Sequence, residues 1–128
     1  TYDDICVSNS QKAEGKTAQF HFNKGKDKSN NEDSYGAISE YTKAININPR
    51  HLGAYNLRGV EKIKIKDYNG ALSDMNMAMK ISPNNRMVYA GRGFAKSYLN
   101  DQQGACSDWK KAASLGYEAA EKWVKNLC

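Results

Sequence analysis

The chain has 128 residues, a length typical of one domain, and its 40% hydrophobic and 26% charged residues exclude a disordered tail. The excess of 19 Lys and Arg over 14 Asp and Glu gives a modest net charge of +5. No apolar run approaches the roughly 20 residues of a membrane-spanning helix.

The first 17 residues match no other part of the chain. Ile5 and Val7 alternate with polar residues, and Asp3 and Asp4 precede them, so we expect a loosely held lead-in segment over residues 1–17. The chain begins with Thr1 and shows no signal-peptide pattern. We therefore expect either that a leader was removed or that the sequence is a piece of a longer protein.

From residue 18 the sequence repeats with a period of 34. Glycines recur at this step at Gly25, Gly59 and Gly93. Further columns hold the same step: Gly36, Gly70 and Gly104; Ala37, Ala71 and Ala105; Ala44, Ala78 and Ala112. A period of this size predicts a stacked-repeat domain over residues 18–128, with repeats at about 18–51, 52–85 and 86–116.

Each unit has the hydrophobic spacing of two helices joined by a turn. In the second unit we expect helices over residues 53–64 and 71–80, with the turn at 66–69 and Pro83 as the stop. In the third unit we expect helices over 87–99 and 104–115, a turn at 100–103, and a stop at Gly116. The first unit is the least regular, because only Phe20 and Phe22 provide apolar anchors on its first helix.

A final amphipathic helix is expected over residues 117–127. Ala120, Trp123, Val124 and Leu127 fall on one face of it. Solenoids need a terminal element that covers the apolar side of their last repeat. The sequence therefore predicts a C-terminal capping helix.

The repeated small residues predict close packing of helices. A glycine inside a helix costs about 1 kcal/mol relative to alanine, so Gly25, Gly59 and Gly93 indicate close backbone approach. We expect Ala37, Ala71 and Ala105 to face these glycines from the second helices. We expect Tyr41, Met75 and Trp109 to fill the space beside these contacts.

At these positions the chain resembles the tetratricopeptide repeat family. The matching features are Tyr55 and Tyr89 before the glycines, Asp67-Tyr68 at the turn, the alanine columns, and Asn48-Pro49. The resemblance covers about residues 18–116. It implies an all-α fold, a right-handed α-α superhelix of three helix-turn-helix units with a concave inner face.

The first helices depart from the family pattern by carrying basic residues four apart, and acids recur on the second helices. The pairs are Lys24/Lys28, Arg58/Lys62 and Arg92/Lys96, and the acids are Glu40, Asp74 and Asp108. We expect an ionic ladder that joins the two helices of each unit, mainly fixing their register. The alternative is a basic stripe for phosphate groups, which would not need acids in phase with it.

The resemblance also implies which residues line the inner face. Carried over unit by unit, they are Gln19, Phe22, Lys26, Gly53, Asn56, Val60, Ile63, Met87, Ala90, Phe94 and Ser97. This surface suits an extended segment or helix with aliphatic anchors. Ordinary helix packing explains Val60, Ile63 and Phe94 equally well. The basic clamp of family members that grip chaperone C-termini is absent, since its places hold Phe22, Lys26, Leu57, Met87 and Gly91.

Three cysteines exclude complete pairing within the chain. A hairpin turn near Gly116 would bring Cys106 and Cys128 together, so a bridge between them is expected, with two buried free thiols as the alternative. The segment around Cys106 and the terminal Cys128 looks like the closing unit of some bacterial exported repeat proteins, which favours a periplasmic or secreted location. Cys6 would remain free or pair outside the chain.

The sequence contains no catalytic or metal-binding constellation. There is no phosphate-binding glycine loop or nucleophile motif, and His21 and His51 are isolated. We therefore expect a non-enzymatic scaffold that binds a protein or peptide, without cofactor, metal, nucleic acid or membrane span. The alternative is a structural module, either a homo-oligomer or a fragment of a longer array, in which another copy completes the weak first unit.

Overall fold

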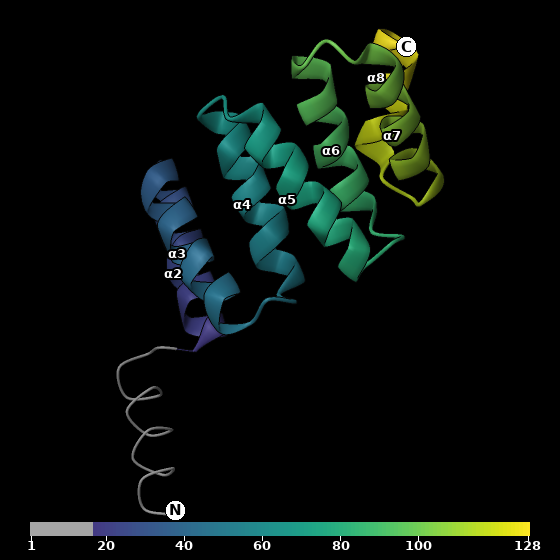
Figure 1. The fold of residues 1–128 in the computed structure, drawn as a ribbon. Coiled ribbons are helices and arrows are strands. Elements are labelled where there is room, and N and C mark those ends of the chain that lie inside the picture. Colours follow the sequence, from purple (N-terminus) through teal and green to yellow (C-terminus); the bar gives the residue numbers. More distant parts are fainter. Residues whose placement is uncertain (1–16) are drawn as a thin grey trace, which may run out of the picture.

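The computed structural model describes residues 17–128, which form seven α-helices and no strand (Figure 1). The helices are α2 (Ala18–Asn30), α3 (Ser34–Ile47), α4 (Leu52–Lys64), α5 (Tyr68–Ile81), α6 (Arg86–Tyr98), α7 (Gln102–Ser114) and α8 (Glu118–Leu127). The predicted all-α class is confirmed. Residues 1–16 of the expected lead-in, with Cys6, lie outside the described residues. Thr17, which we had placed in that lead-in, is the N-cap of α2.

The second helices of the second and third units begin earlier than the hydrophobic pattern predicted. The cause is an aspartate column that the pattern did not use: Asp33, Asp67 and Asp101 are the N-caps of α3, α5 and α7. Asp67 Oδ1, for example, accepts a hydrogen bond from the amide of Gly70 at 3.0 Å. Such a cap satisfies an amide that has no partner within the helix. The expected turn at 66–69 is therefore shorter, because Tyr68 and Asn69 already belong to α5.

The turns within the three units share one backbone conformation. Each contains a residue other than glycine with positive φ: Glu32 at 59°, Lys66 at 67° and Asn100 at 65°. These residues are again 34 apart, so the turn geometry repeats with the sequence. Between α7 and α8 the positive φ of 96° falls on Gly116, which fits its expected role as a stop.

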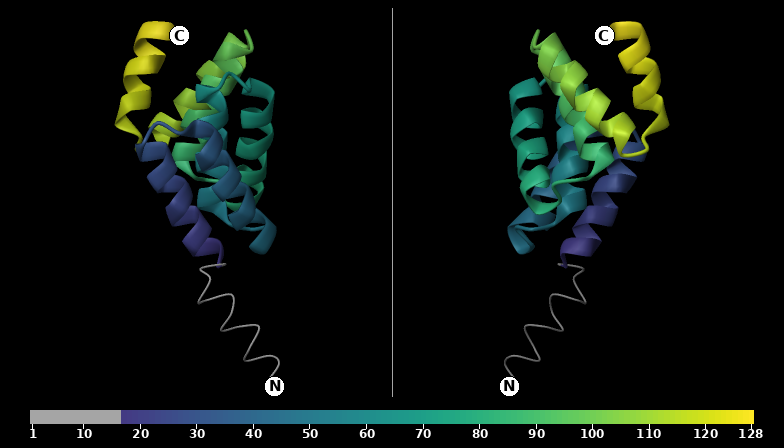
Figure 2. Two further views of the ribbon diagram at one scale, coloured as in Figure 1. Left: turned by 90° about the vertical axis from the view of Figure 1, so that its left-hand side faces the viewer. Right: turned by 90° about the vertical axis from the view of Figure 1, so that its right-hand side faces the viewer.

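The helices stack as antiparallel pairs in a curved array. In Figure 1 the pairs α2/α3, α4/α5 and α6/α7 follow one another, and Figure 2 shows α8 lying beside the last pair. The first helices also pack against one another, α2 on α4 and α4 on α6. This closer approach places the first helices on the inner side of the curve. The predicted right-handed α-α solenoid is thus the observed architecture.

The glycines of the first helices pack against the large side chain of the same unit. A Cβ atom at Gly25 or Gly93 would collide with the ring of Tyr41 or Trp109, and at Gly59 it would lie 2.8 Å from Met75 Cε. The expected alanine contact is seen in the second unit, where the Ala71 carbonyl oxygen would lie 3.4 Å from a Cβ at Gly59. The nearest neighbours of all three glycines are the rings and the thioether of the large residues.

The core is built from the alanine columns and these large residues. Ala37, Ala44, Met75 and Ala112 are fully buried, and Trp109 is 1% exposed. Two expected anchors are largely outside this core. Phe20, in the first turn of α2, is 40% exposed, and Leu127 is 54% exposed at the end of the capping helix. In α8, Ala120 is buried, and Trp123 and Val124 are partly buried and pack against the core of the third unit.

Candidate functional site

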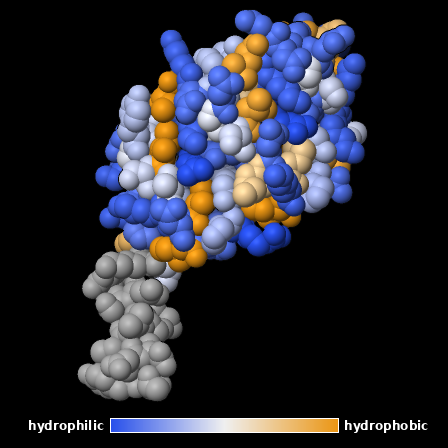
Figure 3. Space-filling model, in the orientation of Figure 1, coloured by the Kyte–Doolittle hydropathy of each residue, from blue (hydrophilic) through white to orange (hydrophobic). Residues whose placement is uncertain are grey.

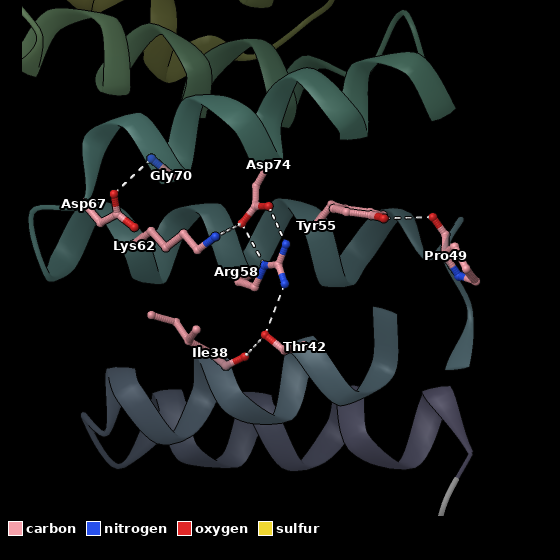
Figure 4. A network of polar contacts seen from close by, with 9 residues as sticks. All are labelled: Ile38, Thr42, Pro49, Tyr55, Arg58, Lys62, Asp67, Gly70 and Asp74. Carbon is pink, nitrogen blue, oxygen red and sulfur yellow. Dashed lines mark hydrogen bonds and ion pairs between the residues drawn. The ribbon is translucent and has the colours of Figure 1, made fainter. Parts of the chain in front are cut away.

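The second unit contains a buried ion-pair network, drawn in Figure 4. Arg58 on α4 donates from Nε to Asp74 Oδ2 at 2.9 Å and from Nη2 to Asp74 Oδ1 at 2.7 Å. Lys62, one turn later, places Nζ 3.1 Å from Oδ2. Arg58 Nη1 also donates to Thr42 Oγ1 at 3.1 Å, so the guanidinium joins α4 to both α5 and the preceding α3. We call Arg58 and Asp74 with these two partners the second-unit clamp.

The third unit repeats this arrangement. Arg92 donates to both carboxylate oxygens of Asp108, at 2.9 and 2.8 Å, and Lys96 Nζ lies 3.1 Å from Oδ2. Arg92 Nη1 bonds Asn76 Oδ1, which stands 34 residues after Thr42. The hydrogen bonds to Asp108 raise the pKa of Arg92 above its already high usual value. The predicted ladder is therefore present in two units, and its aspartates, Asp74 and Asp108, are buried.

In the first unit the predicted ladder is wrong. Glu40 bonds His21 Nδ1 at 2.7 Å and Lys43 Nζ at 3.3 Å instead of the two basic residues of α2. Lys24 lies over the Phe20 ring and Lys28 lies 4.0 Å from Asp33. The reason is that His21 stands in the column of Tyr55 and Tyr89, where its ring nitrogen bonds the Glu40 carboxylate in place of a lysine. Burial acts to raise the pKa of Glu40, but the hydrogen bonds from His21 and Lys43 lower it overall.

An apolar pocket of about 300 Å³ opens on the inner side between α4 and α6. We call it the inner pocket. Six of the residues carried over for the inner face line it: Asn56, Val60, Ile63, Met87, Ala90 and Phe94. Leu57, Lys64, Gly91, Tyr98, Tyr117 and Trp123 complete the lining. The pocket is thus a depression walled by two successive first helices and closed at one end by the cap.

The other carried-over residues lie elsewhere. Gln19 is exposed and bonds Asn23, and Ser97 donates to Gln102 Oε1 at 3.2 Å. Phe22 packs against the rings of Tyr41 and His51, and a Cβ at Gly53 would touch it. Lys26 lines a smaller adjoining pocket. None of these residues lines the inner pocket. Gln19, Phe22 and Lys26 belong to α2, which lies farther along the curve from α6. Gly53, at the start of α4, faces Phe22, and Ser97 on α6 bonds α7 through Gln102.

Sequence reasoning missed the aromatic wall of the inner pocket. Tyr117 and Trp123 come from the capping region, and the Trp123 ring centroid lies 4.6 Å from that of Phe94. The apolar spacing of the final helix was the available signal, but a 34-residue period does not specify where a helix outside the repeat docks. Tyr98, also missed, stacks on Tyr68 with ring centroids 4.6 Å apart.

The two C-terminal cysteines meet as expected. The Cα atoms of Cys106 on α7 and Cys128 after α8 are 5.8 Å apart, so the two cysteines are placed to form a disulfide. Gln102 Nε2 bonds the Leu127 carbonyl oxygen at 3.1 Å beside them. This end of the cap is thus held to α7 by two kinds of contact.

Across residues 17–128, no group of three or more His, Cys, Asp or Glu side chains is arranged to hold a metal ion. Within the same range no helix is both long and apolar enough to cross a bilayer. The face drawn in Figure 3 is mostly hydrophilic, with narrow apolar bands between polar ones.

Comparison with solved structures identifies the architecture. The first TPR domain of Spaghetti (RPAP3), bound to the HSP90 peptide SRMEEVD, is similar with a TM-score of 0.83 and 22% identity, over 88% of this chain and 91% of that one. The Arabidopsis OM64 TPR domain gives a TM-score of 0.79 and 25% identity, over 84% and 93%. The TPR2B domain of yeast Sti1, in a complex with an Hsp70 peptide, gives 0.78 and 21%, over 86% and 91%.

Comparisons of sequence add no relative. No protein-family model matches the chain, and the search of curated proteins gave no significant match. The structural agreement extends over most of this chain and over nearly all of each TPR domain compared. Residues 17–128 therefore have the tetratricopeptide repeat fold.

Proposed function

We propose that the chain is a non-enzymatic binding module that holds a segment of a partner protein on the inner face of its first helices. The inner pocket is the observation that carries this proposal. It is lined mainly by aliphatic and aromatic side chains, and Met87 at its edge is 48% exposed. A partly open apolar depression of this size accepts one or two hydrophobic side chains of an extended or helical segment.

Structural neighbours support this proposal at the level of the fold. The domains of Spaghetti and Sti1 were determined with chaperone peptides. The clamp of chaperone-binding family members is absent from this chain, and three of its places, Leu57, Met87 and Gly91, line the inner pocket. The proposed partner therefore offers hydrophobic anchors rather than an acidic tail.

Random twelve-residue peptides displayed on phage and selected on the folded domain test the proposal. We expect the selected peptides, resynthesised and measured by fluorescence anisotropy, to share hydrophobic anchors. Met87→Lys places a charge at the edge of the inner pocket and should weaken their binding at least tenfold. Met77→Lys is the matched control, because Met77 is 39% exposed on α5 away from the pocket. Equal binding by the two variants would rule out the inner pocket as the site.

Self-association is a second candidate, supported by the first unit. Phe20, Tyr35 and Ile47 are 40%, 72% and 48% exposed, and all three lie on α2 or α3. Another copy packing on this end would cover them. Light scattering across a range of concentrations distinguishes the candidates, because a monomer at every concentration contradicts assembly and leaves peptide binding intact.

We also propose that the protein works in an oxidising compartment, outside the cytoplasm. The support is the pairing of Cys106 with Cys128, since structural disulfides persist where thiols are not kept reduced. Fractionation of cells that produce the full-length natural protein tests this proposal. Recovery in a reducing compartment would contradict it.

A further inference from the structure

A second pocket adjoins the inner pocket and contains a buried carboxylate. It has a volume of about 210 Å³ and lies between α2 and α4. We call it the Glu61 pocket. Leu57 and Val60 line both pockets, so the two are neighbouring parts of one surface. Around Glu61 the lining is polar or aromatic: Lys26, Ser29, Asn30 and Tyr41.

Glu61 is unusual because it is buried without a hydrogen-bond donor. It is 2% exposed, and neither carboxylate oxygen accepts a hydrogen bond from the described residues. Lys64 Nζ lies 2.8 Å from Oε2, but the contact lacks hydrogen-bond geometry, and the lysine side chain is 51% exposed. An ionised carboxylate has about four acceptor positions, and leaving them unmet in the interior is costly. Among residues 17–128, Lys64 is the one cation within ion-pair distance of Glu61.

The neighbouring groups supply no further hydrogen-bond donor to the Glu61 carboxylate. Lys26 places its ammonium group over the Phe22 ring, 5.3 Å from the centroid, and makes no ion pair with Glu61 among the described contacts. In the inner pocket, Asn56 Oδ1 is also buried and accepts no hydrogen bond from residues 17–128. The unmet polar atoms of the two pockets are thus all acceptors. A partner that fills both pockets has to supply donors.

We propose that the bound segment carries a Lys or Arg side chain close to its hydrophobic anchor, and that the cationic group enters the Glu61 pocket and pairs with Glu61. Arginine fits best, because its planar fork donates to both carboxylate oxygens at once. The incoming cation takes the place of Lys64, whose ammonium group moves into solvent at little cost because that side chain is already half exposed. The inference rests on the proposed binding function and specifies the chemistry of the partner.

Fluorescein-labelled peptides with two central Leu residues in a Gly/Ser background test the specificity. Three pools place Arg, Gln or Glu at each flanking position in turn. For the unmodified protein we expect the Arg pool to bind at least tenfold more tightly than the Gln pool, and the Glu pool to bind most weakly. Glu61→Gln keeps the shape of the side chain and should abolish the Arg preference while changing the affinity of the Gln pool less than twofold.

Lys64→Gln should change the affinity for the Arg pool in the opposite direction. Removal of the intramolecular competitor should tighten binding of the Arg pool at least threefold, which a purely structural role of Glu61 does not explain. If the pools bind equally, or if Glu61→Gln keeps the Arg preference, this inference is wrong while the proposed function stands. If Glu61→Gln does not fold, the Lys64→Gln variant decides the question by itself. An unchanged affinity of that variant for the Arg pool then overturns the inference. If Met87→Lys weakens the binding of none of the peptides, the proposed function itself is contradicted.

Discussion

Arg58 and Asp74 form a two-point ion pair across a helical hairpin, with nitrogen–oxygen distances of 2.9 and 2.7 Å. The aspartate side chain is 4% exposed and the arginine 16%. Two cations, Arg58 and Lys62, depend on this one carboxylate. Arg92 and Asp108 repeat the relationship in the next unit. The pairs lie in the junctions between helices, where loss of one partner leaves buried charge behind.

Asp74→Ala should therefore destabilise the fold by about 3 kcal/mol, because it leaves two largely buried cations without a counter-ion. Urea unfolding followed by circular dichroism measures the change. Lys43→Ala is the control, since its side chain is 54% exposed and its loss should change stability by about 0.5 kcal/mol or less. Similar unfolding midpoints for both variants would contradict the importance of the second-unit clamp.

The glycines of the first helices should differ in their tolerance of a methyl group. Gly25→Ala meets the rigid ring of Tyr41 and should cost about 1–3 kcal/mol. Gly59→Ala meets the flexible end of Met75 at 2.8 Å, and a gain of about 1 kcal/mol in helix propensity offsets part of that strain. Thermal unfolding of the two variants compares them directly. The reverse order of melting temperatures would show that the ring yields more readily than the thioether.

Stability should fall in alkaline solution in a way that depends on Tyr41. Burial, and then the nearby charge of Glu61, raise the pKa of Tyr41 to about 12. Between pH 10 and about 12 the unfolded chain loses this phenol proton and the folded chain keeps it, so the free energy of unfolding decreases by about 1.4 kcal/mol per pH unit. Tyr41→Phe removes this contribution and should show a shallower slope above pH 10. Parallel slopes would contradict the raised pKa.

A disulfide between Cys106 and Cys128 should stabilise the fold measurably. The cysteines are 22 residues apart, and closing a loop of that size stabilises a fold by about 3 kcal/mol. Cys128→Ser should lower the free energy of unfolding by about this amount, while Cys6→Ser is the matched control. Thiol labelling of denatured protein that has never met a reductant should leave Cys106 and Cys128 unmodified. Labelling of both would mean that the sulfurs are not bonded.

The helical pairing was predictable because it depends on periodic features. The glycine and alanine columns have the same phase as the ion pairs, so the approach of Arg58 to Asp74 could be expected before any coordinates. The first unit broke the expectation because its columns change: Lys24 replaces the arginine, Glu40 replaces the aspartate, and His21 bonds Glu40 in place of the lysines of α2. A pattern predicts a pair only where both residue types persist.

The candidate site was predictable only in part. Residues on α4 and α6 could be assigned from their column, and Asn56, Met87 and Phe94 do line the inner pocket. The wall formed by Tyr117 and Trp123 depends on how α8 docks, which is set by packing rather than by the period. The unmet acceptors of Glu61 could not be foreseen either, because whether a surface glutamate becomes buried depends on neighbours that are distant in sequence.

The guanidinium of Arg58 reaches back to Thr42, and its own unit offers Asn76 forward to Arg92. Residues 52–85 therefore contain both halves of an inter-unit joint, donor and acceptor, in the correct order. Tandem duplication of that stretch would create a further joint of the same chemistry without any redesign. The protein is in this sense modular at its centre, and its length can be extended there one whole unit at a time.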